Sequence, residues 1–250
     1  MARSSNGESV FSRVVRILEA FGPERPVLGV AELSRRTGLS LATTSRLVSE
    51  LVEHGWLERG PDRRLTVGMR LWEVASRASP ALGLREAAMP VLEDVHAVVG
   101  HHTQLSVLEG REVLFVERLS APGAVINVTR VAGRLPVNAS SSGLVLLAHA
   151  PAAVQEEVLA GPLESYTPHT PTGPGKLRAL LAEVRRTGVA VCPGFIDERA
   201  TGVAVPIRLD GRVVAAVSVI VPNDGGAHAQ IPLLQAAARG IARAMRPGQE

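Results

Sequence analysis

Apolar residues in the first seventy positions recur at the three- and four-residue spacing of short amphipathic helices. The pattern predicts three helices, over residues 8–21, 30–36 and 40–54, each followed closely by a glycine. Two short apolar runs then flank a Gly-Pro-Asp turn within residues 56–68, which is typical of a β-hairpin. Three helices followed by a hairpin are the plan of a winged helix-turn-helix.

After residue 68 the pattern changes to a mixture of strands and helices. Two strand pairs surround the turns Glu109-Gly110 and Asp210-Gly211, and the second turn is a strong hairpin signal. Residues 124–131 are a further strand candidate. Helices are predicted over residues 69–78, 84–99, 140–148, 152–159 and 176–187, and from about residue 229 onwards. Strands and helices with two hairpins indicate an antiparallel α+β domain.

These patterns predict two domains joined by a helix. Residues 1–68 form the winged helix-turn-helix, residues 69–83 a linker helix, and residues 84–250 the α+β domain. In the linker, Ser79-Pro80 separates two helical segments. Its apolar residues are a candidate surface for pairing with a second copy, the alternative being packing within their own chain: Leu71, Trp72, Val74 and Ala75.

The composition narrows the possible functions. The chain has 250 residues, of which 46% are hydrophobic and 20% charged, with a net charge of +3. Binding to nucleic acid would therefore need charge concentrated locally. The one cysteine, Cys192, excludes a disulfide within the chain and a four-cysteine metal site. The N-terminus lacks a signal region, and no apolar stretch approaches the roughly 18 residues of a membrane span. We expect a soluble cytoplasmic protein without membrane contact.

The third predicted helix has one face suited to DNA. At 100° per residue, Thr44, Leu47 and Leu51 share the core side with two valines. The opposite side and its flanks begin with small, hydroxylated or cationic residues, which are Ala42, Thr43, Ser45 and Arg46. Glu50 and Glu53 follow and would repel phosphate. Only the N-terminal half of the helix therefore suits the major groove.

Residues around this helix strengthen the DNA-binding hypothesis. Arg35 and Arg36 end the preceding helix, and Arg63 and Arg64 lie in the hairpin, where they could contact backbone phosphates. Ser40 is a candidate N-cap. Residues 1–70 contain 11 arginines and 8 acidic residues, so the argument depends on placement, not on total charge. The alternatives are a simple capped helix with a solvated Arg46, or a domain that binds another protein.

The order and spacing of several motifs resemble the IclR (isocitrate lyase regulator) family of bacterial transcription factors. In the first domain they are "VVRILEAF" and "LGVAELSRRTGLSLATTSRLVSELVEHGWLER", followed by "LTVG". In the second they are "LREAAMPVLEDV", "VAGRLPVNASSSGLVLLA", "VRRTGVAV" and "AVPIRLDGRVVAAVSVIVP". The resemblance implies an N-terminal winged helix-turn-helix, a linker helix and an effector-binding domain related to GAF and PAS sensors. It also implies a homodimer or a tetramer built as a dimer of dimers.

A two-fold dimer also follows from recognition itself. One helix contacts only a few base pairs, so two half-sites of a palindromic double-stranded operator are needed for useful specificity.

The serines that open the helix at residues 140–148 suggest a second site, because free N–H groups at a helix N-terminus suit a carboxylate. Simple capping by a serine is the alternative.

The resemblance implies which residues line an effector cavity. They align with Leu135, Ser141, Ser142, Gly143, Cys192, Gly202, Ser218 and Ile220. The sequence departs from the family pattern at Leu144, where a lysine is common. It also lacks an aspartate near Cys192 and a cysteine near Gly202, which binders of small acids tend to have. We therefore expect a small organic effector, aromatic or a carboxylate, that is larger or less polar than glyoxylate or pyruvate.

Other residues suggested different chemistry. His101 and His102 could bind a metal, but neighbouring strand residues point to opposite faces. Ser140 to Ser142 could supply a nucleophile with His149 and Asp197, but a G-x-S-x-G elbow is missing. We expect no catalytic site, no resident metal and no cofactor. A sensor whose first domain binds protein and a serine hydrolase remain the alternative functions.

Overall fold

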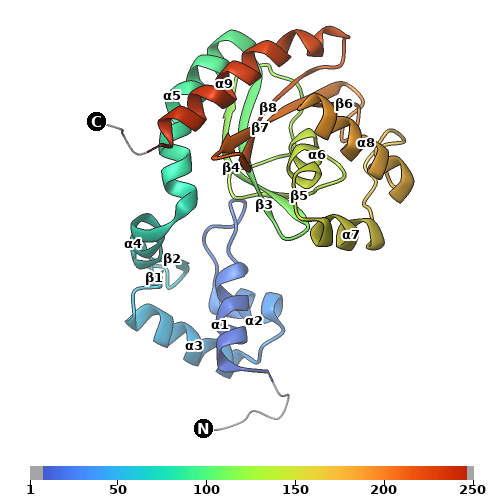
Figure 1. The fold of residues 1–250 in the computed structure, drawn as a ribbon. Coiled ribbons are helices and arrows are strands. Elements are labelled where there is room, and N and C mark those ends of the chain that lie inside the picture. The colour runs from blue at the N-terminus through green and yellow to red at the C-terminus, as the bar shows by residue number, and fades with distance from the viewer. Residues whose placement is uncertain (1–7, 247–250) are drawn as a thin grey trace. The chain divides into compact units, whose positions relative to one another are not determined.

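The computed structural model describes residues 8–246, which form two compact units (Figure 1). The first unit ends at Ser79 and the second begins at Pro80. Each unit encloses hydrophobic clusters of its own, as expected of separate domains.

The first unit has the predicted plan of three helices and a hairpin. Its core joins Ile17, Leu33 and Leu47, one from each helix, to Leu57 and Leu65 of the hairpin, and all five are fully buried. The elements are α1 (Val10–Glu19), α2 (Val30–Thr37), α3 (Leu41–Glu53), β1 (Leu57–Arg59), β2 (Leu65–Val67) and α4 (Met69–Ala78).

The hairpin is hydrogen-bonded to the segment of chain just before α2. Leu28 and Leu65 exchange two backbone hydrogen bonds of 2.9 and 2.8 Å, which adds residue 28 to the edge of the hairpin. Gly38 ends α2 with φ of 67°, a conformation that glycine adopts without steric cost. These contacts set α2, the turn after it and the hairpin in one rigid arrangement around α3.

The second unit is built on an antiparallel sheet with strand order β5-β4-β3-β8-β7-β6. Its strands are β3 (His102–Glu109), β4 (Glu112–Ser120), β5 (Arg134–Pro136), β6 (Ala190–Pro193), β7 (Ala200–Leu209) and β8 (Arg212–Pro222). Its helices are α5 (Pro80–Val99), α6 (Ser141–Ala148), α7 (Ala152–Ala160), α8 (Pro174–Thr187), the 3₁₀ turn η1 (Gly226–Gln230) and α9 (Ile231–Ala244).

The two faces of this sheet carry different helices (Figure 1). Val203 and Val217 point to one face, where they pack with Leu92 of α5 and Leu234 of α9. The opposite face, which includes Ala204, packs against α6, and α8 packs against α6 in turn. Every residue of α6 is buried, as expected for a short helix that is apolar all round. The α+β class predicted from the sequence is therefore confirmed.

The structure corrects the sequence prediction at three places. Residues 124–131, predicted as a strand, form a loop outside the sheet, because the backbone carbonyls of Val125 and Thr129 bond side chains of β3 and β4, His102 and Arg118, and not the backbone of a neighbouring strand. We call this loop the strap. The short strands β5 and β6 were not predicted, since three or four residues carry little periodicity. Helix α5 begins at Pro80 and not at residue 84, because proline suits the first turn of a helix.

Replacement by alanine at two glycines of the second unit should change the free energy of unfolding in opposite directions. A Cβ on Gly143 would lie 2.2 Å from the carbonyl oxygen of Val137, whereas a Cβ on Gly83 would meet nothing within 4 Å. We expect Gly143→Ala to lower the free energy of unfolding by about 1–3 kcal/mol, through overpacking. Gly83→Ala, inside α5, should raise it by about 0.5–1 kcal/mol. Urea denaturation of the full chain measures both, and a stable Gly143→Ala protein would contradict the close contact.

Candidate functional site

The leading turn of α3 is exposed on the first unit. Ala42, Ser45 and Arg46 face solvent, whereas Thr44 and Leu47, on the other side of the helix, are buried. This is the division that the helical spacing predicted. Within its own unit the leading turn is therefore accessible to a groove of DNA.

Ser40 caps this turn. Its Oγ accepts a hydrogen bond from the backbone N–H of Thr43 at 3.2 Å and donates one to the Thr43 hydroxyl at 2.9 Å. The cap holds the first turn of α3 rigid. Leu41, which sequence analysis did not select, is 56% exposed at the first helical position. An exposed apolar side chain there can contact a thymine methyl group.

Arg46 is restrained by its neighbour on the helix. Its Nη1 lies 2.6 Å from Oε1 of Glu50, four residues later, and both side chains are more than half exposed. Exposed pairs of this kind contribute little to stability and exchange readily with other partners. A guanine or a phosphate can therefore replace Glu50 as the partner of Arg46.

Two of the predicted phosphate-contacting arginines gather around one carboxylate. Arg36 and Arg64 lie 3.5 and 3.9 Å from the carboxylate of Glu32, and Arg25 approaches it at 3.9 Å. Arg64 also donates to the carbonyl of Val27 at 2.9 Å. These contacts bring guanidinium groups from the turn after α1, from α2 and from the hairpin into one basic cluster, and sequence analysis did not select Arg25.

The other two predicted arginines point into solvent. Within the described residues, neither Arg35 nor Arg63 forms an ion pair. Arg63 occupies the tip of the hairpin at φ of 62°, an uncommon conformation for a residue other than glycine. Arg59 donates to the Arg63 carbonyl at 3.3 Å and adds a further cation that sequence analysis did not select.

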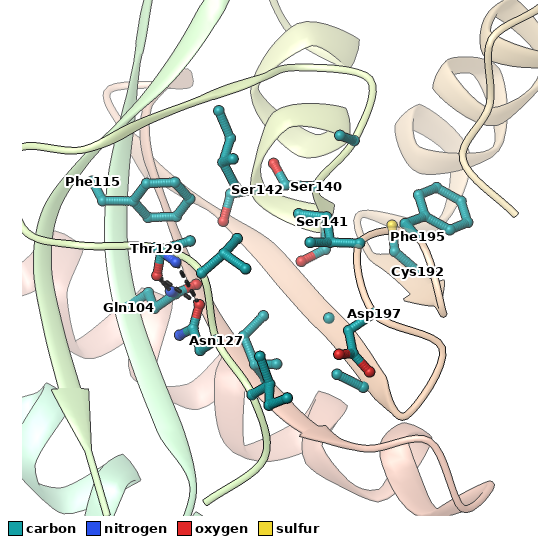
Figure 2. A pocket seen from close by; sticks show the side chains of 18 residues that line it. Gln104, Phe115, Asn127, Thr129, Ser140, Ser141, Ser142, Cys192, Phe195 and Asp197 are labelled. Atoms are coloured by element: carbon teal, nitrogen blue, oxygen red, sulfur yellow. Dashed lines mark hydrogen bonds between the residues drawn. The ribbon is translucent and has the colours of Figure 1, made fainter. Parts of the chain in front are cut away.

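The second unit contains a pocket on the face of the sheet that carries α6 (Figure 2). The space between its walls, including the part open to solvent, is about 480 Å³. The walls come from β3, β4, the strap, the N-terminal end of α6, and the strands and turn between residues 192 and 202.

Six of the eight residues predicted for the effector cavity line this pocket: Leu135, Ser141, Ser142, Cys192, Gly202 and Ile220. Three of them form a row, because Cys192, Gly202 and Ile220 are paired across β6, β7 and β8. Ser218 lies behind the wall and accepts a 2.9 Å hydrogen bond from Ser142. Gly143 faces away, against Val137. Their role in ligand binding remains a prediction.

The missing side chain of Gly202 makes room in this row. A Cβ there would lie 2.8 Å from the Oγ of Ser141 and 3.4 Å from the Cδ1 of Ile220. Beside Gly202, burial raises the pKa of the Cys192 thiol, so the thiol stays protonated and acts as an apolar wall.

The N-terminal end of α6 supplies hydrogen-bond donors to the pocket. Figure 2 shows the Ser141 hydroxyl directed into the cavity. Ser141 is only 3% exposed, and its hydroxyl has no hydrogen-bond partner within residues 8–246. The Ser140 hydroxyl caps the helix by accepting from the Gly143 N–H at 3.1 Å. The N–H groups of the first turn have no partner inside the helix.

A chain of polar side chains crosses the strap side of the pocket, and Figure 2 shows its part from Gln104 through Thr129 to Asn127. The Ser142 hydroxyl donates to Ser218 at 2.9 Å, and Ser218 donates to Oε1 of Gln104 at 3.3 Å. Nε2 of Gln104 donates to the Thr129 hydroxyl, which donates to Oδ1 of Asn127 at 2.8 Å. The chain connects α6, β8, β3 and the strap.

One wall of the pocket carries a charged group. Two side-chain hydrogen bonds from Arg199, of 3.0 and 2.8 Å, hold the pKa of Asp197 at about 2. The carboxylate is therefore ionised at neutral pH and offers only acceptors. Sequence analysis considered Asp197 solely as a partner in hydrolysis.

Several other pocket residues were missed by sequence analysis. Phe115 and Phe195 add aromatic surface, and Gln104 and Asn127 add polar groups. They come from segments separated by up to ninety residues, and no local motif connects them. The one available signal was the alternation of Asn127 and Thr129 with apolar residues in the strap.

The geometry does not assemble a hydrolytic triad. His149 ends α6, at the opposite end from the three serines, and its Nε2 lies 2.7 Å from Arg208. Asp197 is paired with Arg199 instead.

His102 contacts Ser120 and Val125, and residues 8–246 contain no group of three or more metal-binding side chains. No helix in the same range is long and apolar enough to cross a bilayer.

Comparison with known families covers both units. Residues 10–61 match the family model of the IclR helix-turn-helix domain. Residues 77–246 match that of the bacterial transcriptional regulator IclR C-terminal domain.

Individual relatives agree with these matches. A crystal structure of an IclR homolog from Microbacterium hydrocarbonoxydans, complexed with 4-hydroxybenzoate, is 50% identical, with a TM-score of 0.92 over 95% of this chain and 99% of that one. An IclR homolog from Microbacterium sp. strain HM58-2 is 47% identical, with a TM-score of 0.65 over 97% of this chain and 100% of that one. The HTH-type transcriptional regulator XynR of Escherichia coli (strain K12) is 30% identical over 210 residues, 83% of either chain.

The family matches account together for the exposed recognition helix, the basic residues around it and the pocket in the second unit. A helix-turn-helix domain that binds DNA is joined to a domain that binds a small effector. The chain belongs to the IclR family of bacterial transcriptional regulators.

Proposed function

We propose that this regulator binds its operator through the leading turn of α3 and the surrounding arginines, and that an aromatic carboxylate in the α6 pocket controls this binding. The observation that carries the proposal is the pocket itself. It combines hydrogen-bond donors at a helix N-terminus with apolar and aromatic walls. Such a site suits a ligand with one anionic end and a flat apolar body.

The anionic end of the ligand has one favourable place. The first N–H groups of α6 carry partial positive charge, and the Ser141 hydroxyl is buried, unpartnered among the described residues and directed to the cavity. The ionised Asp197 on another wall would repel a carboxylate. We therefore place the carboxylate of the effector at α6.

The ring of the ligand fits the apolar walls. Phe115, Leu135 and Phe195 line the pocket, and Gly202 leaves space beside Ser141. The 50% identical homolog was crystallised with 4-hydroxybenzoate, which is an aromatic carboxylate. This agrees with the sequence-based expectation of a ligand larger than glyoxylate or pyruvate.

We further propose that the regulator acts as a dimer on a palindromic operator, or as a tetramer of two such dimers. In the first unit, α4 exposes Met69, Trp72 and Val74, and α1 exposes Val10 and Phe11. A second copy that covered these side chains would remove apolar surface from water. It would also place two α3 helices on one duplex.

The ligand must distinguish two states to act as an effector. It changes operator affinity only if it binds more tightly to one arrangement of the protein than to another. The segment of α4 and α5, within residues 69–99, connects the two units and is where we place this coupling.

The arginines of the first unit should separate into two classes. Arg46 lies on the leading turn of α3, so Arg46→Ala should reduce operator binding and lower discrimination against unrelated DNA by about tenfold or more. Arg63 lies at the hairpin tip, so Arg63→Ala should weaken binding to all duplexes alike and lower the salt slope by about 1. Fluorescence anisotropy over a range of salt concentrations measures both. Arg77→Ala on α4 is the control, and wild-type behaviour of both test variants would exclude this placement.

A methyl group at position 202 should close the pocket. The Cβ of Gly202→Ala would lie 2.8 Å from the Ser141 Oγ and would displace it. We expect the dissociation constant for 4-hydroxybenzoate to rise by about tenfold or more. Isothermal titration of the full chain measures the change, and Gly83→Ala, remote from the pocket, is the control. Unchanged affinity in Gly202→Ala would mean that the ligand binds elsewhere.

The exposed face of α4 should be needed for self-association. Trp72 is 66% exposed within its chain. We expect Trp72→Glu to shift the protein toward monomers, because a buried carboxylate without a partner is costly in an interface. Sedimentation equilibrium measures the mass, and Glu73→Gln on the same helix is the control. An unchanged assembly of the Trp72→Glu protein would assign the interface to another surface.

A further inference from the structure

Strand β4 contains one extra residue where it pairs with β3. Leu105 lies opposite Glu117, whereas the next residue of β3, Ser106, lies opposite Phe115. Val116 therefore has no partner among residues 102–109 of β3, which is the pattern of a β-bulge. Because side chains alternate along a strand, the extra residue reverses the alternation in the part of β4 that follows it.

The bulge sends Glu117 and Arg118 to opposite faces of the sheet. Phe115 faces the α6 side, where it lines the pocket. Without the bulge, Glu117 would share that face, because it comes two residues later. Instead Glu117 lies beside Leu105, which packs in the layer of α5 and α9. Arg118 then points to the pocket side of the sheet, where it contacts the strap.

Glu117 binds the helix that covers its face of the sheet. Its Oε2 accepts a 2.6 Å hydrogen bond from Nε of Arg85 on α5, and its side chain is only 9% exposed. A carboxylate buried to this degree is strongly disfavoured without its partner, so the pair holds α5 to β4. Along the chain, α5 follows α4 after a single residue, Ser79.

Arg118 holds the strap on the other face. Its Nη1 donates to the carbonyl of Thr129, and its Nε donates to the hydroxyl of Ser120 at 2.9 Å. On the neighbouring strand, Nε2 of His102 donates to the carbonyl of Val125 at 2.6 Å. The strap therefore depends on side chains of β3 and β4 for its position, and it can shift without breaking the sheet.

One carboxylate connects the two faces. Besides binding Arg85, Glu117 accepts a 2.8 Å hydrogen bond at Oε1 from the backbone N–H of Arg118. The strap, which Arg118 holds, forms part of the pocket wall through Ile126 and Val128. A continuous series of contacts thus leads from the pocket, through the strap and β4, to α5.

We propose that the Glu117 carboxylate couples the occupancy of the pocket to α5, by joining Arg85 to the residue that holds the strap. A ligand that prefers one position of the strap also favours one position of Arg118, and with it one arrangement of the Glu117–Arg85 pair. Glu117 and Arg85 are positioning residues, since neither lines the pocket. The inference rests on the proposed control of operator binding by an effector, and it names the residues that transmit this control.

Hydrogen–deuterium exchange of the full chain tests the link without a ligand. Arg118→Met removes the bond to the strap on one face of the sheet. If the link exists, backbone amides in residues 84–92 of α5, on the other face, should exchange about threefold faster or more. Arg178→Met, which removes a 2.8 Å ion pair between α8 and α7, is the matched control and should leave α5 unchanged. Wild-type exchange of α5 in Arg118→Met would overturn the proposal.

The coupling is measured as the ratio of two operator dissociation constants, with and without saturating 4-hydroxybenzoate. In the wild type we expect this ratio to differ from one by about fivefold or more. In Arg85→Met and in Glu117→Gln it should move about threefold or more toward one. The double variant should lose no more than either single variant, because the two residues act through each other.

A conservative variant separates coupling from a merely structural role. Arg85→Lys retains a cation beside Glu117 and should restore most of the wild-type ratio, whereas Arg178→Met should leave the ratio unchanged. Thermal unfolding of each variant establishes that the protein tested is folded, and Glu117→Gln keeps the test decisive if Arg85→Met does not fold. A wild-type ratio in both Arg85→Met and Glu117→Gln would overturn the proposal.

The two levels of the hypothesis can fail separately. If 4-hydroxybenzoate changes operator binding equally in the wild type and in Arg85→Met, the proposed function stands and the role of Glu117 is wrong. If it changes operator binding in neither, the proposed control by an aromatic carboxylate is wrong. The exchange of α5 in Arg118→Met then decides the link alone, since acceleration supports it and wild-type rates overturn it.

Discussion

The burial of α6 against the sheet is the constraint on which the effector site depends. All of its residues are buried, and Gly143 brings its backbone against Val137 so closely that a methyl group would not fit. Because this packing leaves the helix no freedom to shift, its first turn stays in the pocket wall. The cap that Ser140 provides to α6 and the free hydroxyl of Ser141 are consequences of that position.

The two faces of this sheet differ: one packs against helices, and the other lines the pocket. Helices α5 and α9 cover one face with an apolar layer, while the other face carries the polar groups of the pocket. Alternation along β8 produces this division, since Val217 and Val219 point to the apolar layer and Ser218 points to the other side. Buried polar groups such as Gln104 are tolerated there because they are hydrogen-bonded to one another.

In the DNA-binding unit, by contrast, the arginine side chains are restrained only by exposed ion pairs. Glu32 and Glu50 restrain arginines at the surface through pairs that remain largely exposed. Such pairs limit the conformations of long side chains without burying their charge. The arginines therefore remain near one surface and are still free to exchange a carboxylate for a phosphate.

Local sequence was sufficient to determine the helix-turn-helix, the hairpin, the cap at Ser40 and the family. Those features depend on residues within a few positions of one another, where periodicity and capping act directly. The strap shows the limit of this reasoning: its alternating residues 124–131 resemble a strand, but no neighbouring strand pairs with them. Only tertiary structure decided that Gln104, Phe115, Asn127 and Phe195 share one pocket with Ser141. Sheet order and register bring these distant segments together, and such pairings arise from the packing of the whole domain, which no short window of sequence contains.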